Sequence, residues 1–331
     1  MRAFFTLLLL AVLAVGGWLA WALWVPVTPT GQTFVLLHPG YSTRRIAHEL
    51  KSAGVIRSAT AFTIWHRIHH RRSLKAGEYL FEKTATALDI HDRLVRGDVY
   101  VHMVVIPEGF NMFEIAQAIQ QAGLGSSEDF VKVAESGTVL IADIAPGAKT
   151  LEGYLFPSTY EFTRTQTMEE MAAAMVKQFR QVAREVGLTE SPQSNDVQKI
   201  VTLASIIEKE TAAADERPMV ASVYDNRLAK NIPLQADPSV IYAELLQGTY
   251  AGVLHHADMQ FSSAYNTYTH PGLPPGPIGN PGRTSLEAAM HPATTDYFYF
   301  VSDGNSHHRF AHSLEEHNRN VAMYRKIVNQ R

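Results

Sequence analysis

The hydrophobic pattern begins with an unbroken apolar segment, because Ala3 to Val25 contain no charged residue. As a helix this segment would be roughly 34 Å long, enough to cross the ~30 Å hydrocarbon layer of a bilayer. Three tryptophans gather at its far end, as aromatic side chains do at membrane interfaces: Trp18, Trp21 and Trp24. Arg2 precedes the segment and favours a short cytoplasmic stub. The pattern predicts a single-pass anchor over residues 1–27.

A cleaved signal peptide is the alternative interpretation of this segment. Ala20-Trp21-Ala22 has the small-x-small pattern of a cleavage site. The apolar run is longer than the usual core of a signal peptide, which favours a retained helix.

After the anchor the pattern changes to short alternating elements. Residues 26–31 are rich in Pro, Thr and Gly and predict a short linker. Thr33–Leu37 is typical of a strand, Ser42 of a helix cap, and Ser58 of the start of a second helix. These elements predict a small β-α-α module over residues 28–100.

A similar pattern recurs 69 residues later in the chain. His102–Ile106 predicts a strand, and a helix follows whose apolar positions match those of the first unit. Gly123 corresponds to Gly54, and Ser127 corresponds to Ser58. The sequence predicts an α+β fold: an anchor, the small module and a larger α+β domain over residues 101–331.

Composition narrows the possible partners and cofactors. The formal net charge is −3 over 331 residues, so the basic excess of a nucleic-acid-binding protein is missing. The chain has no cysteine, which excludes disulfides and thiolate metal sites. His308 and His312 are four apart, but no HExxH motif occurs. We therefore expect no metal site.

One apolar helix carries two glutamates. The segment Ile200–Thr211 reads IVTLASIIEKET. Because successive helical residues turn by ~100°, Glu208 and Glu210 point in nearly opposite directions. Ordinary glycosidases need two carboxyls facing one bond, roughly 5 to 9.5 Å apart, so this pair does not suit them. A single buried Glu that acts first as acid and then as base fits better.

Apolar neighbours on this helix would raise the pKa of such a carboxyl by desolvation. The plainer alternative is that Glu208 forms an ion pair within a helix network, for example with Arg217. The residues alone do not choose between Glu208 and Glu210.

Several ordered motifs together resemble the YceG-like (MltG) family of endolytic murein transglycosylases. The resemblance extends from the anchor to near the C-terminus. The motifs are LEGYLFP at 151–157, ASIIEKET at 204–211, LQADP at 234–238, AYNTY at 264–268, GLPPGPI at 272–278, HPA at 291–293 and YFV at 299–301.

The resemblance implies a protein of the inner membrane, with a LysM-like module and a catalytic domain in the periplasm. It implies endolytic cutting of peptidoglycan glycan strands, leaving a 1,6-anhydro end and terminating elongation. The family's catalytic glutamate is placed on Glu208. The expected partners are glycan strands, the membrane and peptidoglycan synthases of the elongation or division machinery, and the reaction needs no cofactor.

Five further residues are candidates for contacting the substrate. Gln235 and Asp237 could bind sugar hydroxyls or orient Glu208, although Asp237 could instead cap the following helix. Tyr265 and Asn266 lie in a loop whose aromatic and amide groups suit sugars, and loop packing is the alternative for the tyrosine. Glu152 has either a structural hydrogen bond or a contact in the groove.

Two other functions remain as alternatives. A true hydrolase would use Asp237 as its second carboxylate. A non-catalytic scaffold would only bind peptidoglycan through its LysM-like module.

Overall fold

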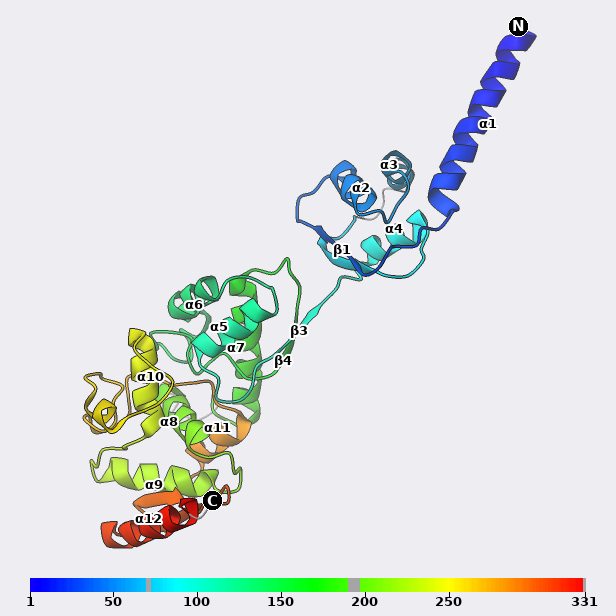
Figure 1. Cartoon of the computed structure of the whole chain (residues 1–331). Helices are drawn as coiled ribbons and strands as arrows, with labels where there is room; N and C mark the ends of the chain where they lie inside the picture. Colours follow the sequence, from blue (N-terminus) through cyan, green and yellow to red (C-terminus); the bar gives the residue numbers. More distant parts are fainter. Residues whose placement is uncertain (70–72, 190–196, 330–331) are drawn as a thin grey trace. The chain divides into compact units, whose positions relative to one another are not determined.

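The structure is a computed structural model that describes residues 1–69, 73–189 and 197–329. The chain divides into two compact units (Figure 1). Unit 1 comprises Met1–Met103 and Glu161–Thr167, and unit 2 comprises Val104–Tyr160 and Met168–Arg331. The α+β character is confirmed by helices combined with three two-stranded sheets in the described part of the chain.

Helix α1 (Arg2–Trp24) is the predicted anchor. It has 23 residues and a mean hydropathy of 2.3, so it is long and apolar enough to cross a membrane. Its last turns are nevertheless part of unit 1, because Ala22 and Leu23 are buried in that unit's core. The backbone of Val27 pairs with Ala85 through hydrogen bonds of 2.8 and 3.0 Å. Residues 26–31, expected to be a linker, thus lie along unit 1.

Unit 1 contains the predicted strand and both predicted helices. Its elements are β1 (Thr33–Leu37), α2 (Thr43–Ser52), α3 (Ala59–Ile68), β2 (Gly77–Phe81) and α4 (Ala87–Arg96). Strands β1 and β2 are antiparallel, with Thr33 opposite Phe81 and Leu37 opposite Gly77. The side chains of Ser42 and Ser58 cap α2 and α3 as predicted. The core between helices and sheet is built by Leu37, Leu50, Phe62, Tyr79 and Leu94.

Unit 2 is mainly helical. Strands β3 (His102–Val105) and β4 (Thr159–Phe162) pair with each other, and each begins in one unit and ends in the other. The elements that lie wholly in unit 2 are α5 (Met112–Gln121), α6 (Ser127–Ser136), η1 (Gly137–Leu140), α7 (Met168–Glu185), α8 (Val197–Glu210), α9 (Arg217–Ala229), α10 (Asp237–Gln247), η3 (His256–Gln260), α11 (Arg283–Met290), β5 (Tyr299–Ser302), β6 (His308–Ala311) and α12 (Leu314–Val328). The order β3-α5-α6 repeats β1-α2-α3, as the sequence pattern predicts. Gly54 and Gly123 both take positive φ, at 73° and 69°.

Helix α8 forms the centre of unit 2, in contact with α9, α10 and α11 (Figure 1). Its apolar side chains are buried on several sides of the helix: Val201, Leu203, Ala204, Ile206 and Ile207. The Pro/Gly-rich loop after residue 270 is fastened to this helix, because Ile278 N donates to Ser205 Oγ at 3.0 Å. The C-terminal end of α8 therefore places its two glutamates at a junction of several elements.

Candidate active site

Glu208 forms a buried ion pair. Its Oε1 accepts from Arg217 Nη2 at 2.7 Å, and its Oε2 accepts from Gly282 N at 2.9 Å. The Glu208 side chain is only 5% exposed. This geometry matches the ion-pair alternative that the sequence leaves open for Glu208.

Glu210 points to the other side of α8 and borders a cavity of about 290 Å³. The cavity is lined by residues from several helices, loops and a strand of unit 2: Glu210, Tyr224, Arg227, Leu234, Gln235, Asp237, Tyr268, Phe300 and His317. Burial raises the pKa of Glu210 to about 7, and the charge of Asp237 acts in the same direction. A hydrogen bond from Tyr224 and the charge of Arg227 partly oppose this rise. A carboxyl with this pKa can give and take a proton near neutral pH.

Arg227 fixes the loop that forms one wall of the cavity. Its guanidinium donates to the carbonyl oxygens of Phe298 at 2.7 Å and Leu234 at 2.9 Å. It also donates to the side-chain oxygen of Gln235 at 3.3 Å. Gln235 has φ of 54°, a strained conformation for a residue with a side chain. The arginine thus holds Gln235 at the cavity in a conformation that the loop alone would not favour.

Asp237 lines the same cavity, and a chain of hydrogen bonds holds its side chain there. Its Oδ1 accepts from Tyr268 Oη at 2.5 Å. The backbone N of Tyr268 in turn donates to Asn266 Oδ1 at 2.9 Å, and the Asn266 amide donates to the carbonyls of Met259 and Phe261. Asn266 is fully buried, so it shapes the loop that presents Tyr268.

The alternative role of Asp237 as a helix cap does not match its position. Asp237 is the first residue of α10, and Ala236 occupies the cap position without a capping side chain. Tyr265, the other loop candidate, packs against Tyr242 with ring centroids 5.2 Å apart. The structure thus brings Gln235 and Asp237 to Glu210 and gives Tyr265 a packing contact.

Glu152 lies inside unit 2 with 1% of its surface exposed. Its carboxylate accepts from Met112 N at 2.9 Å, from Tyr242 Oη at 3.0 Å and from Asn280 Nδ2 at 2.8 Å. Burial raises the pKa of Glu152 to about 7. These contacts match the structural role considered for Glu152 and leave it no surface for a substrate.

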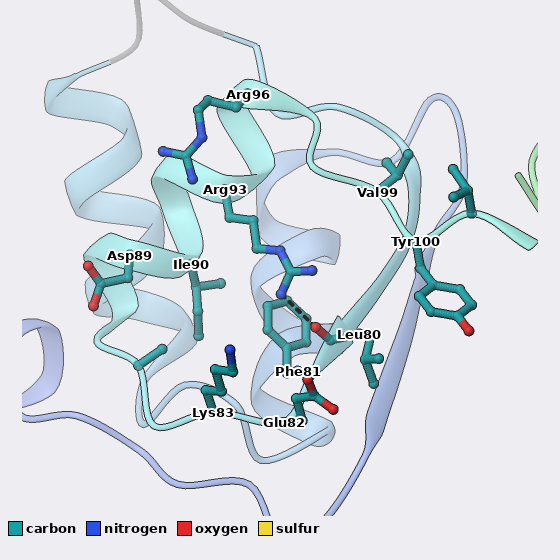
Figure 2. Close-up of a pocket in the computed structure, with 12 residues that line it drawn as sticks. Leu80, Phe81, Glu82, Lys83, Asp89, Ile90, Arg93, Arg96, Val99 and Tyr100 are labelled. Carbon is teal, nitrogen blue, oxygen red and sulfur yellow. Dashed lines mark hydrogen bonds between the residues drawn. The ribbon is translucent and has the colours of Figure 1, made fainter. Parts of the chain in front are cut away.

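A second cavity, of about 560 Å³, lies in unit 1 between β2, α4 and residues 99–101 (Figure 2). Figure 2 shows the Arg93 side chain in its centre, donating to Leu80 O at 2.5 Å. Arg96 is paired with Asp98 at 2.8 Å. Hydrogen bonds from Thr86 lower the pKa of Asp89. Arg93, Arg96 and Asp89 of this cavity are thus engaged within the module, whereas the cavity of unit 2 contains an acid whose pKa is about 7.

Metal chemistry has no obvious site in the part of the chain that the structure describes. Within those residues no three His, Asp or Glu side chains are grouped so that they could hold a metal ion. His308 contacts Glu216 at 2.8 Å, and His312 contacts Asp296 at 2.9 Å. These two histidines are each used in a separate pair.

The cavity of unit 2 thus has on its wall a half-buried glutamate whose pKa is raised. Residues 35–323 match the YceG-like family, and the chain belongs to that family.

Similar proteins carry a common name. A protein of Bacillus subtilis called endolytic murein transglycosylase is 33% identical over 92% of this chain and 89% of its own length. A protein of Streptococcus pneumoniae with the same name is 28% identical over 96% of this chain, which spans 64% of that longer relative. The crystal structure of a yceG-like protein from Listeria monocytogenes matches with a TM-score of 0.59 and 33% identity, over 87% of this chain and 98% of that one.

Proposed function

We propose that this chain is a membrane-anchored endolytic murein transglycosylase that uses Glu210 as its acid and base. The observation that carries the proposal is the Glu210 carboxyl at the wall of a cavity, where desolvation raises its pKa to about 7. The names of the relatives supply the substrate class, which is the glycan strand of peptidoglycan. Helix α1 supplies the attachment to the inner membrane, with both units on the periplasmic side.

The reaction needs one proton donor and no water. Protonated Glu210 gives its proton to the oxygen that links MurNAc to GlcNAc, and the bond between that oxygen and C1 breaks. The C6 hydroxyl of the same MurNAc attacks C1, and the carboxylate of Glu210 takes the hydroxyl proton. A 1,6-anhydro ring closes and the enzyme is restored. Acid–base catalysis of this kind contributes typically about 10² to 10⁴ in rate.

The polar residues of the cavity have supporting roles in this proposal. Gln235 and Asp237 bind sugar hydroxyls, and Tyr268 holds Asp237 in place through its 2.5 Å hydrogen bond. Glu208 is assigned to structure instead of catalysis, because donors engage both of its oxygens and its side chain is almost fully buried. The partners proposed are nascent glycan strands and the synthases that extend them.

The test compares the two glutamates directly. Isolated glycan strands are digested with the full chain, with Glu210→Gln and with the matched variant Glu208→Gln. We expect Glu210→Gln to lose cleavage by at least about 10², the scale of lost acid–base catalysis, and Glu208→Gln to keep it where folded. Loss in Glu208→Gln alone would return the catalytic role to Glu208. If the parent chain itself binds strands without cutting them, the scaffold alternative gains.

A hydrolase remains the second candidate, because Asp237 lies in the same cavity as Glu210. Mass spectrometry of the products separates the two reactions, since an anhydro end is lighter by one water than a hydrolysed end. In the hydrolase, Asp237→Asn would abolish cutting. In the proposed reaction, Asp237→Asn weakens binding and leaves the product mass unchanged.

A further inference from the structure

The end of the anchor helix is built into unit 1. Leu19 packs against the core of the unit, and Ala22 and Leu23 are buried in it. Arg57 holds the same end, because its Nη2 donates to Pro26 O at 2.9 Å and its guanidinium lies 5.1 Å from the Trp21 ring centre. Unit 1 and the last turns of α1 therefore move together.

The length of α1 leaves no spacer between this unit and a membrane. A hydrocarbon layer of ~30 Å needs about 20 apolar helical residues. Helix α1 has 23 residues, and Leu19 to Leu23 already contact unit 1. When α1 spans a bilayer, the part of unit 1 around its end must lie at the depth of the lipid headgroups.

The outward face of α3 is apolar at this end of the unit. Ile64 and Ile68 are four residues apart on one helix face and are 38% and 68% exposed. Phe62, which lies on the opposite side of the helix, is buried. The outward face of a helix in a water-soluble domain is normally polar. Solvent is therefore not the partner that this face fits best.

The face is continuous with the anchor. Trp65 of α3 contacts Trp24, the last residue of α1, edge to face with centroids 5.6 Å apart. Ile68 follows Trp65 by one helical turn. Arg67 and His69 accompany these apolar residues. Apolar and aromatic side chains beside basic ones are typical of helices that lie in a membrane interface.

We propose that Trp24, Ile64, Trp65 and Ile68 form a membrane seat, which rests in the interfacial layer of the phospholipid bilayer. The inference relies on α1 spanning that bilayer, as in the proposed function. The seat fixes the orientation of unit 1 relative to the membrane plane. The anchor helix therefore holds unit 1 in one orientation and does not serve as a flexible attachment.

The absence of cysteine from the chain makes single-site labelling direct. The full chain is placed in nanodiscs of phosphatidylglycerol and phosphatidylethanolamine, with a fluorophore on Ile68→Cys or Ile64→Cys. The matched control is Met103→Cys, because Met103 belongs to the same unit and is also 68% exposed. Quenching is measured with brominated lipid tails and, separately, with iodide in water.

We expect brominated lipid to quench the probe at residue 68. We expect iodide to quench that probe several-fold less than it quenches the probe at residue 103. Equal iodide quenching at both positions, without lipid quenching at residue 68, would overturn the seat. Protection of residue 68 in cell membranes but not in lipid nanodiscs would also overturn it, by indicating a protein partner.

A probe at Leu9→Cys on α1 separates failure of the seat from failure of the anchor. Strong lipid quenching at residue 9 together with aqueous behaviour at residue 68 rejects the seat and keeps the anchor. Strong iodide quenching at residue 9, without quenching by brominated lipid, rejects both the anchor and the seat. Cutting of isolated strands by these labelled variants is measured in parallel, so a failure of the proposed catalysis is seen independently.

Discussion

Glu208 and Glu210 show how two residues of one helix can have different roles. A helix turns by ~100° per residue, so positions two apart face different neighbours. Glu208 faces Arg217 on the next helix, whereas Glu210 faces Tyr224 and a cavity. The sequence predicts the divergence of the two side chains and offers Arg217 as a partner for Glu208. The cavity beside Glu210, however, is completed by residues far along the chain, such as Phe300 and His317. The family resemblance implies that Glu208 is the acid, whereas our proposal assigns that role to Glu210 because it borders the cavity.

The pH dependence of cutting should report the titration of Glu210. The protonated form starts the reaction, so activity should fall about tenfold per pH unit above pH 7, where burial places the pKa of Glu210. Tyr224→Phe removes the hydrogen bond that lowers this pKa, so the fall should begin at a higher pH. The measurement is kcat/KM on isolated strands from pH 5 to 9. A profile unchanged by Tyr224→Phe would contradict the assignment to Glu210.

Stability should also depend on pH through the buried acids. Burial raises the pKa of Glu152 from 4.5 to about 7 in the folded chain. Between these two values the folded state binds more protons than the unfolded state, so unfolding becomes easier as pH rises. The free energy of unfolding should fall by about 1.4 kcal/mol per pH unit for each such group. Urea unfolding between pH 5 and 7 measures this slope, and Glu152→Gln should reduce it. An equal slope in Glu152→Gln would contradict the shifted pKa.

The roles of polar candidates depended on burial that the sequence does not show. Gln235 and Asp237 were predicted to bind sugar hydroxyls or to orient Glu208, and they line the cavity beside Glu210 instead. Asn266 and Glu152, by contrast, form hydrogen bonds with backbone and side-chain groups inside the protein. A polar residue in a motif is equally suited to a substrate or to a loop until its surroundings are known.

At the scale of elements, the serine caps at Ser42 and Ser58 predicted the starts of two helices. The strand at Thr33–Leu37 and the helices after Ser42 and Ser58 are confirmed. Helix α4 was not predicted from the sequence. Its capping box of Thr86 and Asp89 was a readable signal. The pairing of β3 with β4 had no local signal, since more than fifty residues separate the two strands.

Gly153 is the glycine on which packing beside α8 depends most directly. It has φ of 88°, and an added Cβ would lie 2.4 Å from Pro277 Cγ and 2.8 Å from Val201 Cγ1. Gly153→Ala should therefore cost the strain of positive φ, about 1 kcal/mol, plus about 1 to 3 kcal/mol for overpacking. The free energy of unfolding measures the sum.

Gly187→Ala is the matched control for this substitution. Gly187 has φ of 77°, but no heavy atom lies within 4 Å of an added Cβ. Gly187→Ala should lower the free energy of unfolding only by the strain of the positive φ, and it should keep full activity. Equal losses of stability in the two variants would show that the contacts of Gly153 with Pro277 and Val201 are unimportant.

At the scale of the whole molecule, the anchor and the first folded unit are one body. The sequence pattern places a boundary near residue 27, because charge and composition change there. Burial of Leu23 and the pairing of Val27 with Ala85 extend the folded unit across that point. Arg164 also belongs to unit 1 and contacts Glu78 at 3.1 Å, although it lies in the middle of the second predicted domain. Contacts between distant segments leave no periodic pattern, so the sequence could not reveal either extension.

Leu23→Ala should therefore loosen unit 1, although Leu23 belongs to the anchor helix. Its side chain is 3% exposed within the unit, and replacing a buried leucine by alanine typically costs about 2 to 5 kcal/mol. Leu9→Ala changes the same residue type on the same helix at a position outside the core. Hydrogen exchange of residues 33–96 in nanodiscs should accelerate in Leu23→Ala and stay at the parent rate in Leu9→Ala. Parent-like exchange in both variants would mean that the anchor only tethers the unit, and the membrane seat would lose its mechanical basis.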